Sequence, residues 1–495
     1  MGSFEKRVVN ELNTTSGLPI PGPFLATLGF SQSELSTVLL AGPLAGLIVP
    51  PIVGALSNGN RYSFILYGSL GVLLSLPCLA WADGIGVTLG NLFPRKSDAP
   101  ILVSKGMAVV AAYVLNVSMQ PLHINLRASL MEYCPPHQQT VASLWITRFS
   151  AFGSVFGTSI AYFASPSFKL LAASSCCVLG AALILHGIET RRQRTVLTPL
   201  QRREVTKESL ASAVSKFGRL FKLAVRLPNV TRRVCRTQMF AWFARYHNPV
   251  STSSNRRRKM PFLGADSSFI DLINISGHGG HYNAEAESKR AGAGVALVFH
   301  AAALSMTLIL HSICDTPTQA STSLDRRTSK TVVEGGSESE RLNCEEIETQ
   351  LFRLWSLSLC IGAAAMFGVW FVGDVGNIAA LILGLMGVVF SVANWVPYAL
   401  IAIDVSVMHE RKSSVEYADD SRRNEPQLDH ITAVLAVHNG AICIPQILSS
   451  GTTSLAFWIM KYFHLKAAVS WMFLIIVPSL LLAAWDRETL GLRKR

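Results

Sequence analysis

The sequence predicts an all-α polytopic membrane protein. Half of the 495 residues are hydrophobic, only 15% are charged, and the mean hydropathy is +0.35. Soluble domains carry about 25% charged residues, so this composition excludes a soluble enzyme, a secreted disulfide-stabilised domain and a disordered chain. Charges are absent or nearly absent from ten stretches, each long enough to span a bilayer core of about 30 Å. Since these stretches do not alternate polar with apolar residues, they predict helices rather than barrel strands.

The ten spans form two groups of five. The first group lies at Ser36–Ser57, Ser63–Ala82, Gly106–Leu126, Val141–Phe163 and Leu170–Gly187. The second group lies at Gly292–Ile313, Leu354–Gly373, Asn377–Ile403, Ile431–Met460 and Ala467–Trp485. Three other segments are rich in Ser, Thr, Arg, Glu and Gly, and we therefore expect them to be long polar loops. These segments are Arg245–Arg290, Cys314–Leu351 and Val405–Asp429.

A basic segment separates the two groups. Thr190–Arg236 carries 13 Lys and Arg against two acidic residues, so it supplies +11 of the chain's formal charge of +13. Basic loops remain on the cytoplasmic side of a membrane. We therefore expect an N-terminal bundle over residues 1–189, a basic cytoplasmic linker over 190–236 and a C-terminal bundle with long polar loops over 237–495. Since spans flank the linker, nucleic acid is not an expected partner, and contact of the linker with anionic lipid would be a side effect of its charge.

The number of spans in each half follows from the two basic ends. The C-terminal tail is basic like the linker, so both are expected on the same side, which requires an even number of spans between them. Gly17–Phe30 and Val234–Tyr246 are the candidates for a sixth span in each half, although both are short. Six plus six spans is the arrangement of transporters with repeated halves. The first and seventh helices are then truncated.

A polar stripe is the strongest signal for a site. Asn116, Gln120, His123 and Arg127 follow one another in steps of four, three and four, which places them on one helix face. Charged groups inside a membrane usually face a cavity or a partner. The stripe therefore predicts a wet cavity with groups that bind sugar hydroxyls and an imidazole that titrates. The alternative is that Arg127 lies near the headgroups, close to Pro135-Pro136, and extends toward them.

Other polar residues in the spans are candidates for the same path. Glu132 faces away from the stripe, so it pairs with a neighbouring helix or carries a proton, and Arg148 also needs a partner. Asp404 closes a span near a membrane surface. His438 is either a proton relay or a packing residue, and Gln446 lies one or two turns beyond it.

Small residues mark helices that pack closely. Gly42 and Gly46, and also Gly153 and Gly157, form GxxxG motifs, which are typical of tight packing or of helices that slide on one another. The sequence contains no nucleotide-binding loop and no common hydrolase motif, and its nine cysteines form no CxxC pair. Asp429-His430, the candidate site for a membrane enzyme acting on lipid, has no supporting motif. We therefore expect no enzyme and no metal or cofactor site.

Several blocks resemble the fungal branch of the sucrose and α-glucoside proton symporters, which belong to the major facilitator superfamily and are similar to glycoside–pentoside–hexuronide cation symporters. The blocks, which fall in the family's order, are Ala41–Asn58, Asn125–Gln139, Val234–Phe243, Asn394–Asp404 and His438–Ile447. The resemblance implies a twelve-helix major facilitator fold that carries a disaccharide inward with a proton. It implies no cofactor beyond the proton gradient, and a location in the plasma membrane or the vacuolar membrane.

The resemblance also implies roles for single residues. Arg127 matches a family arginine needed for substrate coupling, and Glu132 matches a carboxylate that closes the same motif. Arg148 matches an arginine of the fifth helix. The block that begins at Asn394 adds this residue to the substrate and proton path.

The chain departs from the family at Asn116, His123 and Asn58, and in the basic loop of which Arg61 is part. The family usually has Asp at Asn116 and Gln at His123, and an amide cannot exchange a proton as a carboxylate can. The loop that gates related transporters has Asp where this chain has Asn58, and only Arg61 remains of its basic cluster. These departures favour an alternative, a non-transporting member of the fold such as a sugar sensor or a decayed paralogue.

Overall fold

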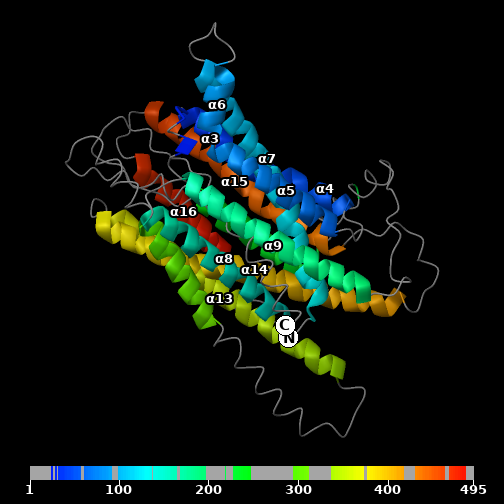
Figure 1. Cartoon of the computed structure of the whole chain (residues 1–495). Coiled ribbons are helices and arrows are strands. Elements are labelled where there is room, and N and C mark those ends of the chain that lie inside the picture. The colour runs from blue at the N-terminus through cyan, green and yellow to red at the C-terminus, as the bar shows by residue number, and fades with distance from the viewer. Residues whose placement is uncertain are drawn as a thin grey trace.

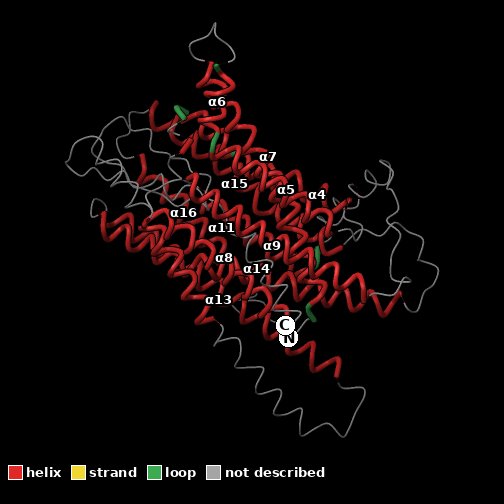
Figure 2. The backbone as a smooth tube through the Cα atoms, viewed as in Figure 1, coloured by secondary structure: helices red, strands yellow, loops and turns green. Residues whose placement is uncertain are grey.

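The structure is a computed structural model, and it confirms the all-α prediction. It describes residues 24–25, 28–30, 32–56, 61–91, 99–135, 138–163, 168–196, 218, 227–246, 294–310, 336–372, 376–416, 430–462 and 468–485. Within these ranges the chain is helical apart from short turns and contains no strand (Figure 2). Seven of the described helices are long and apolar enough to cross a membrane, and two shorter apolar helices accompany them.

Each of the ten predicted spans is a helix in the structure (Figure 1). The N-terminal half consists of α3 (Gln32–Leu39), α4 (Ala41–Leu56), α5 (Arg61–Ala80), α6 (Ala82–Gly90), α7 (Ala99–Tyr133), α8 (Gln139–Phe163) and α9 (Phe168–Val196). The C-terminal half consists of α11 (Asn229–Tyr246), a helix over Gly294–Leu310, α13 (Gly336–Val372), α14 (Gly376–Glu416), α15 (His430–Tyr462) and α16 (Ala468–Ala484).

The predicted polar loops are wrong where long helices extend into them. α13 begins at Gly336, so part of the segment assigned to a loop before Leu351 is helical, and α14 continues past Val405 to Glu416. α11 likewise ends at Tyr246, which lies just inside the predicted loop Arg245–Arg290. The extension of α13 is rich in Glu and also contains Gln, Arg and Leu, and that of α14 contains Glu, Arg, Lys and Met, all of which are strong helix formers. A helix already formed in an apolar span is extended at little cost, so polarity alone did not end it.

The two helices predicted to be short differ in how much of them the structure describes. Most of Gly17–Phe30 lies outside the described residues, although Leu25 is fully buried in the apolar core of the N-terminal half. Val234–Tyr246 forms most of α11, an 18-residue helix that packs against α14, α15 and α16. Since α9 continues to Val196 and α11 begins at Asn229, helix is present at both edges of the segment 190–236. The assignment of this segment as a cytoplasmic linker remains a prediction.

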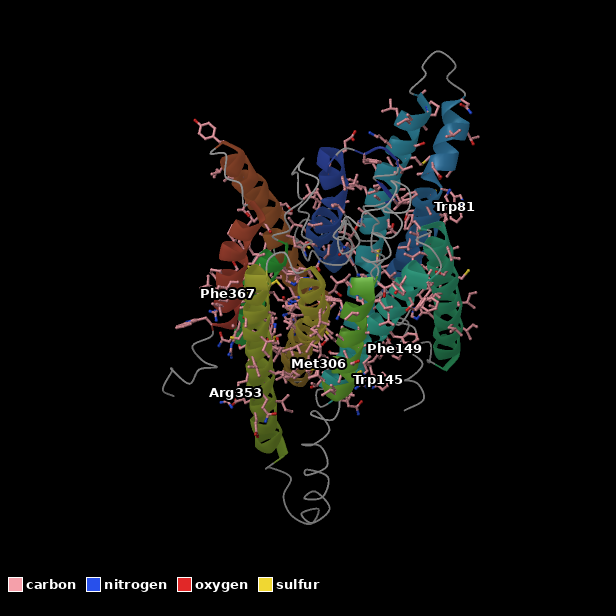
Figure 3. The ribbon with its side chains drawn as sticks, turned by 90° about the vertical axis from the view of Figure 1, so that its left-hand side faces the viewer. Trp81, Trp145, Phe149, Met306, Arg353 and Phe367 are labelled. Carbon is pink, nitrogen blue, oxygen red and sulfur yellow. The ribbon has the colours of Figure 1, made fainter. Side chains whose placement is uncertain are left out.

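One end of the bundle is defined by the end of α9 and the start of α11, and we call it the linker end. Figure 3 shows Arg353 and Trp145 toward this end, and Trp81 and Phe367 toward the opposite end. The largest cluster of buried apolar side chains joins the two halves, with Val53, Ile124 and Leu144 packed among residues of α13, α14 and α15. The two halves therefore share one core.

The outer surface is apolar. Leu74 and Leu102 are each 70% exposed, and Leu482 is 55% exposed. Water-soluble proteins rarely expose apolar patches this extensive, whereas lipid tails cover them without penalty. Together with the apolar spans, this surface makes the chain an integral multi-pass membrane protein.

Candidate functional site

The first two residues of the polar stripe lie against the glycine face of α4. A Cβ atom at Gly42 would lie 3.3 Å from Asn116 Oδ1, and one at Gly46 would lie 3.7 Å from Gln120 Oε1. The Asn116 side chain also donates a hydrogen bond of 2.9 Å to the Ala112 carbonyl of its own helix. The GxxxG motif thus provides the space that brings two amide side chains of α7 onto α4.

α15 completes this contact from the other half. Asn439 Nδ2 donates a hydrogen bond of 2.6 Å to the Gly46 carbonyl and a longer one of 3.4 Å to Gln120 Oε1. A Cβ atom at Gly46 would lie only 2.5 Å from Cys443 Sγ, so a larger residue does not fit there. The sequence analysis did not include Asn439 in the site, although its place beside His438 in a family block was a usable signal.

Arg127 is held by an aromatic ring of the C-terminal half. Its guanidinium carbon lies 3.6 Å from the centroid of the Tyr398 ring, and the Arg127 side chain is half-buried. The Tyr398 ring also contacts His438 edge to face, with 4.9 Å between ring centroids. His438 is 1% exposed, and its Nε2 atom has no hydrogen-bond partner. Arg127, Tyr398 and His438 therefore form one group built from α7, α14 and α15.

Two further polar contacts join the halves through α8. The buried Arg148 donates two hydrogen bonds, of 3.2 and 3.0 Å, to the carbonyl of Thr307, and its guanidinium lies over the Trp145 ring. Trp395 of α14 donates a hydrogen bond of 3.1 Å to the Thr140 carbonyl.

Glu132 and Asp404 make contacts within one half. Glu132 forms an ion pair of 3.4 Å with Arg61 of α5, which places two predicted site residues together in the N-terminal half. Asp404 accepts hydrogen bonds from the backbone N–H (3.1 Å) and the hydroxyl (2.5 Å) of Thr231, in the first turn of α11. A carboxylate at this position satisfies a free helix N–H and complements the helix dipole.

The other predicted residues lie apart from the Arg127 group or outside the described residues. Gln446 is buried two turns beyond His438 on α15, and His123 is half-buried on α7. Asn394 lines a separate cavity. Asn58, assigned to the gating loop, lies outside the described residues.

The cavity beside Asn394 lies within the C-terminal half. Its empty volume is about 710 Å³, open space at its mouth included, and its walls come mainly from α11, α13, α14 and α16. Gln238, Trp242 and Arg245 of α11 also line it, and Arg245 lies over the rings of Trp242 and Phe390. The volume is in the range of small-molecule pockets. The sequence analysis missed these residues of α11, although their steps of four and three already placed them on one helix face.

The polar contacts between the halves gather toward the linker end. There α4 and α15 approach closely, because a Cβ atom at Gly54 would lie 3.6 Å from the Thr432 carbonyl and 3.7 Å from Ala433. Farther from this end, α15 leans away from the helices of the N-terminal half (Figure 3). α8 and the helix Gly294–Leu310 remain close near the opposite end, where Tyr162 lies 3.2 Å from the Cβ position of Gly294. Among the described residues no group of three or more His, Cys, Asp or Glu side chains is placed to hold a metal ion.

Comparison with known proteins gives relatives in sequence. The general alpha-glucoside permease of Schizosaccharomyces pombe is 26% identical over 233 residues, which cover 45% of this chain and 41% of that protein. The sucrose transport protein SUT5 of Oryza sativa subsp. indica is 26% identical over 250 residues, which cover 46% of each protein. The chain thus matches less than half the length of these curated relatives. No protein-family model matches it.

Comparison with solved structures shows the fold. The major facilitator superfamily proton:xylose symporter XylE bound to 6-bromo-6-deoxy-D-glucose has a TM-score of 0.55 and 13% identity, with 97% of this chain and 93% of that chain covered. A bacterial homologue of the iron transporter ferroportin in an outward-facing state has a TM-score of 0.55 and 11% identity, with 97% of each chain covered. The major facilitator fold is therefore confirmed. The resemblance to sucrose and α-glucoside transporters is also confirmed, and the named relatives are transporters and not enzymes.

Proposed function

We propose that this protein is a proton-coupled symporter that carries sucrose or a related α-glucoside across a membrane by alternating access. Two sequence relatives are named for an alpha-glucoside permease and a sucrose transport protein, and the fold is that of the major facilitator transporters. The observation that carries the proposal is the position of Arg127, whose guanidinium spans the boundary between the halves onto Tyr398. A group at this boundary changes its surroundings when the halves move.

The chemistry at the boundary suits a polyhydroxyl substrate. Gln120 and Asn439 present amide groups, and Arg127 presents a planar set of N–H donors, all of which bind hydroxyl oxygens. These three side chains come from both halves, so a substrate bound among them contacts both. Binding between two halves that rock about the site is the basis of alternating access. The structure then corresponds to a state closed at the linker end.

The proposed cycle uses the proton gradient as its energy source and needs no other cofactor. The basic segment 190–236 places the linker end on the cytoplasmic side, in either the plasma membrane or the vacuolar membrane. The partners are a disaccharide, a proton and the bilayer. Acidification on the side opposite the linker then drives the sugar toward the cytoplasm.

Uptake of radiolabelled sucrose and maltose by cells that lack their own carriers tests this proposal. Uptake is measured at external pH 5 and 7, with the amount of protein at the surface determined in each case. We expect uptake to rise at pH 5, and Arg127→Ala to abolish it without removing the protein from the membrane. Absence of uptake from a well-expressed protein, or uptake that does not change with pH, would overturn the proposal.

A second candidate function is a sugar-binding protein that does not transport. It is favoured by Asn116, which has an amide where the family usually has a carboxylate, and this amide is bonded to the Ala112 carbonyl. A sensor of this kind binds sucrose in a detergent-solubilised preparation but produces no flux in proteoliposomes. Measuring binding and flux on the same preparation separates the two functions.

A further inference from the structure

We propose that His438 is the proton-binding group that releases the closed linker end, and that Tyr398 positions Arg127 to respond to it. This inference rests on the proposed function, because it identifies where the coupling proton acts. The Tyr398 ring contacts both cationic residues, with Arg127 over its face at 3.6 Å and the His438 ring at 4.9 Å.

His438 has the environment of a group that is neutral while the linker end is closed. Its side chain is 1% exposed, and Nε2 has no hydrogen-bond partner. The Tyr398 ring that it contacts also holds the Arg127 guanidinium, whose carbon lies 3.6 Å from the ring centroid. An imidazolium buried beside a guanidinium without a counter-ion is strongly disfavoured.

The neighbouring helices bring no compensating carboxylate. α4 and α16 contain no ionisable side chain within their bounds, and the arginines of α11 that the structure places over aromatic rings contact Phe352, Trp242 and Phe390. The Cys235 thiol of α11 packs one turn away, in a cluster with Val437 and Ala441. Of the carboxylates on α7 and α14, Glu132 pairs with Arg61, and Asp404 accepts hydrogen bonds from Thr231. The ionisable side chains on the helices around the imidazole also include Arg127 and His123 of α7, Tyr398 of α14, Cys235 of α11 and Cys443 of α15.

Protonation has a defined consequence in this geometry. Nε2 uses its free lone pair to accept a proton from water that follows the polar stripe of α7, and no covalent bond breaks in the protein. Two cations then share the Tyr398 ring, so the closed contact is destabilised and the halves separate at the linker end. The separated imidazole is exposed to the cytoplasm, where it returns the proton to water. Tyr398 takes part as a positioning residue, because its ring holds Arg127 beside His438.

The effect of pH on the balance between the closed and open states of the linker end has a defined direction and size. If His438 has the ordinary imidazole pKa of about 6.5 in the open state and stays neutral in the closed state, acid stabilises only the open state. Lowering the pH from 7.5 to 5 then favours the open state by about 30-fold. Replacement with glutamine, which cannot take up a proton in this range, removes this dependence.

Distance measurement between spin labels tests the inference without relying on transport. Labels on Leu56→Cys of α4 and Glu346→Cys of α13 report the separation of the halves at the linker end, and both positions are exposed. The protein is full-length, in nanodiscs, with its other cysteines replaced. We expect the population of longer distances to grow between pH 7.5 and 5 in the parent protein and in His300→Gln, a control imidazole on another helix. We expect no such change in His438→Gln, and the same response in all three proteins, or none in the parent, would overturn the inference.

Variants of Tyr398 and a transport assay complete the test. Tyr398→Phe keeps the ring and should retain the pH response, whereas Tyr398→Leu removes the ring and should reduce the response at least threefold. In proteoliposomes, His438→Gln should lose the accumulation of sucrose that a pH gradient drives, whereas the control His300→Gln should keep it. Acid-driven accumulation that survives in His438→Gln refutes the inference and leaves the proposed function standing. A pH response of the label distance that depends on His438, in a protein that carries no sugar, supports the inference and refutes the proposed function.

Discussion

The two ends of the helix bundle are held by different kinds of contact. At the linker end, Arg148 is buried and Arg127 half-buried, and each contacts the opposite half. Toward the other end, the ion pairs Lys169–Asp83 and Lys105–Glu34 join helices of the N-terminal half, and their side chains are partly exposed. Exposed pairs exchange readily with water and contribute little, whereas a buried charge that loses its partner is costly. Among the described residues, the arginine contacts toward the linker end therefore join the two halves, whereas these two ion pairs toward the opposite end lie within one half.

Substitution at Gly46 should have the largest effect on the closed end. Gly46→Leu places a side chain where even a Cβ atom would lie 2.5 Å from Cys443 Sγ and 3.1 Å from Asn439 Nδ2. Because α4 and α15 then cannot approach, we expect sucrose uptake to fall at least tenfold at an equal surface amount. Gly84→Leu on α6 is the matched control, since nothing lies within 4 Å of a Cβ atom there. Equal uptake by the two variants would show that this close approach is not needed.

Removal of the Arg148 contact should have the next largest effect. Arg148→Met keeps much of the side-chain volume but leaves the Thr307 carbonyl without its two hydrogen bonds. Hydrogen bonds to a charged group contribute about 1.5–3 kcal/mol, so thermal unfolding in detergent should begin several degrees lower. Arg353→Met, on the exposed surface of α13, is the control and should change stability by less than about 0.5 kcal/mol. A shift no larger than the control's would show that the contact contributes nothing.

The start of α11 offers a smaller perturbation at the same end. Asp404→Asn removes the negative charge beside the first turn of α11 but keeps an oxygen that accepts from Thr231. Loss of the charge at a helix N-terminus should cost about 0.5–1 kcal/mol, measured as the free energy of unfolding. Thr231→Val removes the hydroxyl alone and separates its contribution from that of the backbone N–H. An unfolding free energy that is unchanged in Asp404→Asn would contradict the assigned helix-capping role.

The smallest effect is expected at the opposite end. Burial raises the pKa of the Asp83 carboxyl, but the hydrogen bond and the charge of Lys169 outweigh it and hold the pKa below 3.8. A lowered carboxyl pKa stabilises the folded state above pH 3.8 and loses this contribution as the pH falls through the lowered value. Asp83→Asn should therefore cost at most about 1 kcal/mol, by the same amount at pH 5 and pH 8, and less at high salt. A cost that changes between pH 5 and pH 8 would show that this pair titrates elsewhere.

The sequence predicted the fold closely because apolar length is a strong signal in a membrane protein. Each span from Ser36 onward is a helix, and the spacing of Asn116, Gln120 and Arg127 did place them on one helix. The polar extensions that begin at Gly336 and end at Glu416 were missed because a polar composition indicates contact with water but does not show where a helix ends. A polar segment with high helix propensity continues an existing helix.

The partners of the site residues could not be predicted in the same way. Arg127 and Tyr398 are 271 positions apart in the sequence, and Asn439 and Gly46 are 393 apart, so no local pattern reports that they meet. The residues of α11 had a usable signal in their spacing, but the sequence analysis interpreted that segment only as a short, truncated helix. Glu132 was expected either to pair with a neighbouring helix or to carry a proton, and in the structure it forms an ion pair with Arg61 of α5.

A reversible cross-link at the linker end tests most directly whether its closed state opens during transport. The Cβ position of Gly54 lies 3.7 Å from Ala433, so Gly54→Cys together with Ala433→Cys places two thiols within reach of a disulfide. Sucrose uptake is measured after oxidation and again after reduction, with the cross-linked fraction determined on the same sample. The account predicts that uptake is lost in proportion to cross-linking and returns on reduction. Undiminished uptake by fully cross-linked protein would contradict it.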